Sequence, residues 1–276
     1  MIRFAKAHAY GNDFLYVLRS TVDGVSLPAL AREMCHRHTG IGADGLILYT
    51  LGPAGASMVL INSDGSRAEV SGNGVRALGA WIGLHDTAPS LELTIDTEGG
   101  VKTLTRLDRD GTRQLFRAAM GLPTKIQPAR IEAGGEVVDG VSLNIGNPQF
   151  IVLGPLPDDE RFNRLGAALE HHAHFPEGTN VEFVQVDSPT QVRIRIWERG
   201  CGPTSSSGTG SCASLVVAAA FGGAARVAQV EAPGGTQRVE WTDESVYLTG
   251  WAEVLCEGEW LRPLPREGQA LSGATA

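Results

Sequence analysis

Ser71-Gly72-Asn73-Gly74 and Ser207-Gly208-Thr209-Gly210 are the two stretches that decide the fold of this chain. Each opens a run of apolar and small residues, 75–82 and 211–220, which predicts a helix. A helix N-terminus carries unpaired N–H groups and a partial positive charge, and glycine lets an anion approach that backbone closely. Two such ends that face each other would bind one carboxylate and place a serine hydroxyl on either side of it. That arrangement suits chemistry at the carbon next to a carboxylate.

Composition limits the class of protein. A chain of 276 residues predicts two domains of about 130 residues each. The net charge of −8 argues against a general role in binding nucleic acid or an acidic membrane. The start predicts no signal peptide, and no run approaches the roughly 18 apolar residues of a membrane span. The four cysteines form no CxxC pair, so neither a metal site nor a disulfide framework is expected, and a reducing cytoplasm is the simplest location.

The predicted elements follow the same order twice. Each half is rich in short strands, carries one peripheral helix, and contains one of the two Ser-Gly-x-Gly helices. The strands are expected at 2–4, 15–18, 46–49, 57–62, 91–97, 101–104, 141–145, 150–153, 180–186 and 191–197, and the peripheral helices at 26–35 and 158–172. This pattern indicates an internally duplicated α+β fold with the site between its halves. We expect the halves to be 1–118 and 119–256, joined near 120–123, with 257–276 packing back onto the first.

Short motifs in a fixed order connect the chain to a known family. The chain resembles the diaminopimelate epimerases, which are pyridoxal-independent amino-acid epimerases of the proline-racemase-like group. The resemblance rests on Gly11-Asn12-Asp13-Phe14, Gly40-Ile41-Gly42-Ala43-Asp44-Gly45, Asn62-Ser63-Asp64-Gly65-Ser66, Gly72-Asn73-Gly74, Gly146-Asn147-Pro148, Gly178-Thr179-Asn180-Val181, Glu198-Arg199-Gly200 and Gly208-Thr209-Gly210. It implies two pseudo-symmetric halves, each a barrel-like, mostly antiparallel sheet around a central helix, with the active site in the cleft between them.

The resemblance also implies a function. The reaction would convert LL- to meso-diaminopimelate, in lysine and peptidoglycan synthesis, without cofactor or metal. The partner would be a small amino acid, with no nucleic acid or membrane involved, and the protein would form a homodimer. By this resemblance Ser71 and Ser207 occupy the catalytic positions. The substrate would be bound by Asn12, Asn62, Asn147, Asn180, Glu198 and Arg199, and its carboxylate by the backbone N–H groups of Gly72, Asn73, Gly208 and Thr209. A planar guanidinium such as that of Arg199 also suits a second carboxylate on chemical grounds.

The chain departs from the family at the reacting groups. The family uses two cysteines, one of which removes the α-proton while the other delivers a proton to the opposite face. Here both positions are serine, Ser71 and Ser207. A cysteine titrates near pH 8.5, whereas a serine hydroxyl acts as a base only beside another general base. The histidine of the family's Asn-Pro-His run is Gln149, and the glutamate that usually follows Gly202 is Pro203.

Three explanations of these differences stay open. The serines can be an engineered pair, the chain can be a natural homologue with weak or lost epimerase activity, or it can catalyse a different isomerisation or elimination. A non-catalytic amino-acid-binding protein is a further alternative. Glu198 is the best remaining base, through a pKa raised by burial. Cys201 is interpreted as a small apolar residue, with a displaced thiol acid or base as the alternative, and Asp44 as a turn-capping residue.

Overall fold

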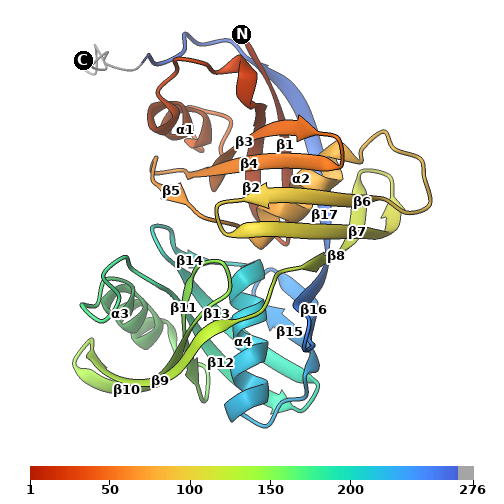
Figure 1. The fold of residues 1–276 in the computed structure, drawn as a ribbon. Coiled ribbons are helices and arrows are strands. Elements are labelled where there is room, and N and C mark those ends of the chain that lie inside the picture. Colours follow the sequence, from red (N-terminus) through yellow and green to blue (C-terminus); the bar gives the residue numbers. More distant parts are fainter. Residues whose placement is uncertain (267–276) are drawn as a thin grey trace, which may run out of the picture.

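The computed structural model describes residues 1–266, which form two strand-rich halves stacked one above the other (Figure 1). Each half wraps strands around one long helix. The two halves repeat the same order of pairings, so that a parallel pair follows each helical crossover. The internal duplication and the α+β class expected from the sequence are therefore confirmed.

The N-terminal half is a closed barrel of eight strands. Neighbours pair in sequence order around the ring, and the last strand of the chain closes it by pairing with both β8 and β1. The strands are β1 (Ile2–Ala9), β2 (Asn12–Leu18), β3 (Gly45–Gly52), β4 (Gly55–Asn62), β6 (Glu92–Thr97), β7 (Gly100–Asp110), β8 (Arg113–Ala119) and β17 (Val246–Trp260). The β2–β3 and β4–β6 pairs are parallel because α1 (Leu27–Cys35) and α2 (Gly72–Ile82) lie in their connections, and the others are antiparallel.

The C-terminal half repeats this scheme but leaves its ring open among the described residues. Its parallel pairs are β11–β12 and β13–β15, which α3 (Asp159–Glu170) and α4 (Gly208–Phe221) connect. The strands are β9 (Thr124–Ala133), β10 (Glu136–Asn144), β11 (Pro148–Leu153), β12 (Asn180–Ser188), β13 (Gln191–Glu198), β15 (Val227–Ala232), β16 (Gly235–Trp241) and the start of β17. Each half also has a short extra strand just before its central helix, β5 (Arg67–Ala68) and β14 (Gly202–Thr204), and the 3₁₀ turn η1 (Arg19–Thr21) follows β2.

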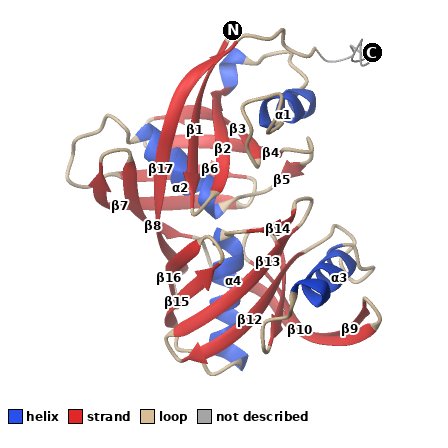
Figure 2. Ribbon diagram, turned by 180° about the vertical axis from the view of Figure 1, so that it is seen from behind, coloured by secondary structure: helices blue, strands red, loops and turns tan. Residues whose placement is uncertain are grey.

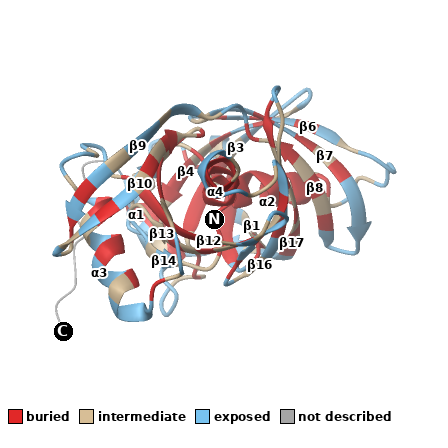
Figure 3. Cartoon of the chain, turned by 90° about the horizontal axis from the view of Figure 1, so that it is seen from below, coloured by how far each residue is buried: buried red, intermediate tan, exposed pale blue. Residues whose placement is uncertain are grey.

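The central helices lie inside the sheets because their residues are mostly apolar or small, and Arg76 of α2 is the one charged residue in the two helices. In α4 every residue from Gly208 to Ala218 is buried, and Figure 3 shows this helix end-on within its ring of strands. A helix that is apolar on all sides is stable only when it is surrounded. The peripheral helices α1 and α3 have one apolar face each and cover smaller cores outside the sheets.

Strand β17 crosses from one half to the other, as the view from behind shows (Figure 2). Its first residues pair with β16, its middle with β8, and its end with β1, where Trp260 lies opposite Ile2. Residues 120–123 form no helix or strand, and they connect β8 to β9. The division into 1–118 and 119–256 stays a prediction. Of the segment 257–276, residues 257–260 lie on the first half, and 267–276 are outside the described residues.

Candidate active site

Ser71 and Ser207 are the N-caps of the two central helices. The Gly74 N–H donates to Ser71 Oγ and the Gly210 N–H donates to Ser207 Oγ, both at 3.1 Å. Each serine has extended backbone angles, as an N-cap requires. The predicted helices therefore begin at Gly72 and Gly208, and both serines have a structural role before any chemistry is considered.

The two helix ends meet at their first glycines. A Cβ added to Gly208 would lie 2.8 Å from the Gly72 Cα, closer than real Cβ contacts, and a Cβ on Gly72 would lie 3.0 Å from the Gly208 Cα. Only glycine allows this approach. The first turns of α2 and α4 thus lie against each other, and helix ends of this kind bind carboxylates.

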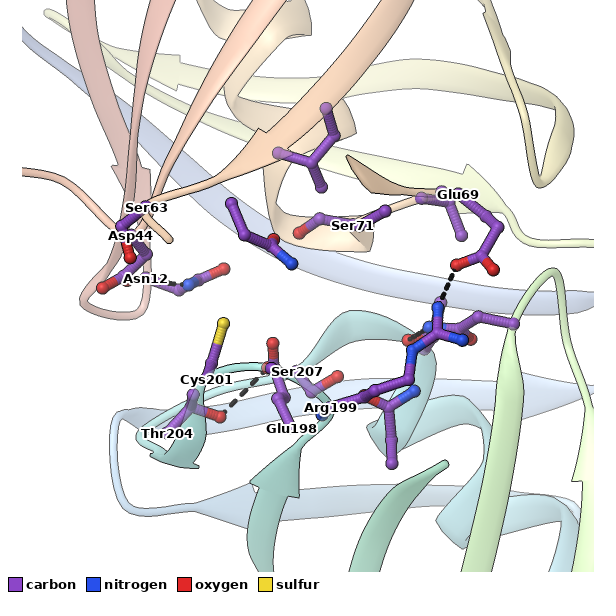
Figure 4. Close-up of a pocket in the computed structure, with 18 of the residues that line it drawn as sticks. Asn12, Asp44, Ser63, Glu69, Ser71, Glu198, Arg199, Cys201, Thr204 and Ser207 are labelled. Carbon is purple, nitrogen blue, oxygen red and sulfur yellow. Dashed lines mark hydrogen bonds and ion pairs between the residues drawn. The ribbon is translucent and has the colours of Figure 1, made fainter. Parts of the chain in front are cut away.

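A cavity of about 200 Å³ lies at this point, between the two halves. Figure 4 shows Ser71 on the wall formed by the N-terminal half and Ser207 on the opposite wall. Nine of the twelve predicted site residues line it, namely Asn12, Asn62, Ser71, Asn147, Asn180, Glu198, Arg199, Ser207 and Thr209. Gly72, Asn73 and Gly208 do not line it. The Asn73 side chain is fully buried and donates to Asn12 Oδ1 and to the Ser206 carbonyl.

The cavity's asparagines are held by neighbours within the walls. Asn12 Nδ2 donates to Asp44 Oδ2 at 2.8 Å, and Asn62 Nδ2 donates to Ser66 Oγ at 3.0 Å. Asn180 is fixed at both ends of its amide, because Nδ2 donates to the Pro148 carbonyl and Oδ1 accepts from the Arg199 N–H. These contacts fix the direction in which each amide faces the cavity.

Arg199 connects the two walls. Its Nη2 forms an ion pair with Glu69 of the N-terminal half, which Figure 4 marks with a dashed line, and its Nη1 donates to the Glu177 carbonyl at 3.0 Å. Sequence reasoning did not find Glu69. Its position two residues before Ser71 was the available signal, but no sequence pattern places it opposite an arginine 130 residues away.

Glu198 is the one cavity carboxyl with a shifted pKa in the neutral range. Burial is the largest cause, and together with the nearby charge of Asp44 it raises the pKa of Glu198 to about 7. The hydroxyls of Thr204 and Ser207 act against that shift by hydrogen bonding to the carboxylate, with Thr204 Oγ1 at 3.0 Å from Oε1. A carboxyl with this pKa exchanges protons readily at neutral pH.

Ser71 has no comparable partner. In the described part of the chain its side chain makes only the capping hydrogen bond, and the residues of its half that line the cavity include the apolar Phe14, Leu60 and Val70. Glu69, the nearest carboxylate in sequence, is paired with Arg199 instead. The two serines therefore share a backbone setting and differ in the chemistry next to their hydroxyls.

Gln149, which stands where the resemblance expects histidine, belongs to a buried network beneath α4. When its amide nitrogen is oriented toward Glu182, it lies 3.0 Å from both carboxyl oxygens, and the amide oxygen lies 3.2 Å from Thr209 Oγ1. Burial, with the nearby charge of Glu198, raises the pKa of Glu182 well above its ordinary value. The network supports Thr209 from the side away from the cavity.

Two further residues reach the cavity. Cys201 lines the cavity, and its sulfur points into it (Figure 4); its interpretation as a small apolar residue stays a prediction. Burial, together with the nearby carboxylates, raises the pKa of Cys201 to about 12. Asp44 accepts hydrogen bonds from Asn12 and from the Asp13 N–H, and it pairs with Arg37.

Two other kinds of feature are absent from residues 1–266. Among residues 1–266, no three side chains of His, Cys, Asp or Glu are grouped as a metal ion would require. No helix in this part of the chain has the length and apolar character needed to cross a membrane.

The sequence matches the family "Diaminopimelate epimerase" over residues 4–126 and 141–255. A diaminopimelate epimerase of Desulforudis audaxviator is 39% identical, and the match covers 95% of this chain and all of the relative. The chain belongs to the diaminopimelate epimerase family. A second relative with the same name, from Pelotomaculum thermopropionicum, is 35% identical over 94% of this chain and 99% of its own length. Membership places the chain among the isomerases.

Solved structures share the fold at low sequence identity. A probable proline racemase from Agrobacterium radiobacter has a TM-score of 0.75 with 17% identity, covering 95% of this chain and 93% of its own. A hydroxyproline epimerase from Agrobacterium vitis has a TM-score of 0.72, also with 17% identity, and covers 93% and 91%. A methylitaconate-delta-isomerase has a TM-score of 0.61 with 14% identity, covering 93% and 94%. The expected racemase and epimerase fold is confirmed.

Proposed function

We propose that this chain binds diaminopimelate, or an amino acid similar to it, between its halves and removes the α-proton with Glu198 as the base. The observation that carries the proposal is the position of Glu198, whose pKa is about 7, in the cavity where the two helix N-termini meet. A general base acts best when its pKa lies near the working pH. The name shared by the relatives supports the choice of substrate.

Each group of the cavity has a part in the proposed reaction. The α-carboxylate would lie against the first-turn N–H groups of α2 and α4, and Arg199 would bind a second carboxylate. Glu198 would accept the α-proton, and the electron pair of the broken C–H bond would spread into the carboxylate as an enediolate. The N–H groups of the two first turns would stabilise that added negative charge.

The two faces of the substrate would differ in reactivity. Glu198 and Ser207 lie on one wall, and Ser71, without a base, on the other. Removal and return of the proton on the Glu198 side need only one base. Inversion also needs a proton from the opposite side, which an unassisted serine hydroxyl supplies slowly. We therefore propose that exchange of the α-proton is faster than epimerisation.

The same asymmetry supports a second candidate function. A single base can remove a proton from one carbon and return it to another carbon on the same face, which is an isomerisation without inversion. One carboxyl with a pKa of about 7 on one wall is sufficient for that reaction. This candidate predicts double-bond migration in an unsaturated carboxylic acid rather than a change of configuration.

The test uses LL-diaminopimelate in deuterated water. Proton NMR follows loss of the α-proton signal, and chiral chromatography follows the meso product. We expect deuterium to enter the α-position faster than meso product forms, and the Ser71→Cys/Ser207→Cys double variant to form meso product faster than the wild type does. Binding without exchange in either protein would favour the amino-acid-binding alternative. Absence of binding would contradict the proposed substrate.

A further inference from the structure

Arg76 in α2 is a buried cation without an acidic partner. Its side chain has 0% exposure, and none of the ion pairs within residues 1–266 includes it. Nη2 donates to Asn73 Oδ1 and, at 2.6 Å, to Gln237 Oε1, while Nε and Nη1 have no hydrogen-bond partner. A buried charge of this kind is costly to keep in the folded state. Its retention therefore needs a cause other than stability.

The guanidinium lies behind the junction of the two central helices. Asn73, which accepts its hydrogen bond, belongs to the first turn of α2. Gln237, the other acceptor, donates to Ser206 Oγ and Ser211 Oγ, both at 3.3 Å, on either side of the α4 N-cap. Arg76 is thus connected through one side chain to each of the two helix ends that meet at the cavity.

The surroundings of Arg76 provide no negative charge. Burial raises the pKa of Tyr16 well above its ordinary value, and it raises the pKa of Tyr10 as well. Burial also raises the pKa of Cys212 to about 12. These three groups are therefore neutral near pH 7. A second buried cation, Lys102, is also without an ion pair in the described chain, and its Nζ donates to the Met120 carbonyl at 2.8 Å.

Arg76 also sets the direction of a hydrogen-bond chain that ends at the cavity. A guanidinium only donates, so the Asn73 oxygen faces Arg76 and the Asn73 nitrogen donates onward to Asn12 Oδ1. The Asn12 nitrogen then donates to Asp44, a carboxylate that only accepts. Because the two ends of the chain are fixed in this way, neither amide can reverse without losing hydrogen bonds.

We propose that Arg76 is a positioning residue for anion binding, whose missing counter-charge is the carboxylate of the molecule bound at the two helix ends. The inference rests on the proposed function of the cavity. An anion there would gain from the N–H groups and also from the fixed positive charge behind them. The ligand class is therefore a carboxylate, and a neutral amide of the same shape would bind more weakly.

The test compares charge with shape at position 76. Arg76→Lys keeps the charge, whereas Arg76→Gln keeps an amide donor and removes the charge, with Arg76→Met as a second neutral variant. Calorimetry measures the affinity for diaminopimelate. Chemical shifts of the Gly72 and Gly208 amides measure binding of acetate and of acetamide. We expect the neutral variants to bind diaminopimelate and acetate at least tenfold more weakly, the lysine variant to stay within about threefold of wild type, and acetamide binding to stay unchanged.

Arg106→Gln is the matched control, because Arg106 is also buried but is paired with Asp86. It should lower stability and leave both affinities unchanged. Three results would overturn the inference: an equal loss of affinity in Arg76→Lys and Arg76→Gln, an unchanged affinity in all variants, or failure of both neutral variants to fold. If the wild type binds acetate in an Arg76-dependent manner but not diaminopimelate, the inference holds and the proposed substrate fails. If diaminopimelate binds equally well to the wild type and to the Arg76 variants, the inference about Arg76 fails and the proposed substrate stands. If neither diaminopimelate nor acetate binds, the inference and the proposed substrate both fail.

Discussion

The first turn of α2 and the first turn of α4 are the same structure in two different surroundings. Both begin at a serine N-cap with the same 3.1 Å capping hydrogen bond, and both continue with Gly-x-Gly. Beside Ser207 lie the Glu198 carboxyl, with its pKa of about 7, and the Thr204 hydroxyl. Ser71 makes only its capping hydrogen bond within the described residues, and no carboxyl is hydrogen-bonded to it there.

This difference separates binding from proton transfer. Both first turns have the same backbone arrangement, with a capped helix N-terminus. The candidate base stands on one side only, because Glu198 and Thr204 lie outside the repeated motif. A serine in place of a thiol matters less beside a carboxyl that can accept a proton than beside apolar side chains, so the α4 side is where we expect proton chemistry.

Removal of the base should have the largest effect. Glu198→Gln keeps the hydrogen bond from Thr204 and removes the proton acceptor. We expect it to lower the rate of α-proton exchange by about 10²- to 10⁴-fold, measured by NMR in deuterated water. Glu170→Gln is the control, since Glu170 is a buried carboxyl that accepts from Trp197 and from the Gly200 N–H. A similar loss of exchange rate in both variants would show that Glu198 is not the base.

Single cysteine substitutions test whether the α2 side lacks an acid and a base. Ser71→Cys introduces a thiol at a helix N-terminus, where the thiolate is favoured. We expect meso-diaminopimelate to form at least tenfold faster than in the wild type, whereas Ser207→Cys should change inversion less because Ser71 still limits it. Chiral chromatography measures the product. A larger gain from Ser207→Cys would reverse the assignment of the deficient side.

Loss of the Ser71 cap and loss of the Ser207 cap should lower stability equally, whereas the two positions should differ in their effect on activity. Ser71→Ala and Ser207→Ala each remove one capping hydrogen bond, which lowers the free energy of unfolding by about 1 kcal/mol in urea denaturation. Ser214→Ala is the control, because this buried α4 hydroxyl has no hydrogen-bond partner. It should be neutral or slightly stabilising. Unequal losses at positions 71 and 207 would show that the two first turns differ in backbone energetics as well.

The pH dependence should show the smallest effect. Glu198 acts as a base when ionised, so exchange should rise with pH through about 7 and then level off. Thr204→Val removes a donor to the carboxylate, so the midpoint should move to higher pH by less than about one unit. Ser71→Ala should leave the midpoint unchanged. A downward shift in Thr204→Val would contradict the role given to that hydroxyl.

The same pKa affects stability in the opposite direction. Because the pKa of Glu198 is raised from 4.5 to about 7 in the folded protein, this group makes the fold less stable as pH rises between those values. In Glu198→Gln that contribution to the pH slope should disappear. Thermal unfolding at pH 5 and at pH 8 measures it, and an unchanged slope would mean that Glu198 does not titrate in this range.

The sequence predicted the parts of the fold that depend on local patterns. The starts of α2 and α4 follow from Ser-Gly-x-Gly, because helix caps are decided by neighbouring residues. Most residues named for the site also line the cavity, because they were identified together from their positions in the family's motifs.

Contacts between distant segments could not be predicted in this way. The Glu69–Arg199 ion pair joins residues from different halves, and Arg76 looks in the sequence like an exposed charge on a helix. The sequence does not show that Cys201 lines the cavity, because the position of its loop depends on how the halves meet. The partner in each case is set by how the halves meet, which no local pattern records. The expected homodimer stays a prediction.

Strand β17 has a consequence for the order in which the protein is made. The N-terminal barrel is translated first, but its seam between β1 and β8 closes only when residues 247–260 pair with both. A ribosome that has not yet released this segment therefore carries a first half with two unpaired strand edges, which are sites of misassociation. The first half therefore closes only after β17 has been made, and a stop shortly before Val254 would leave β1 without this partner.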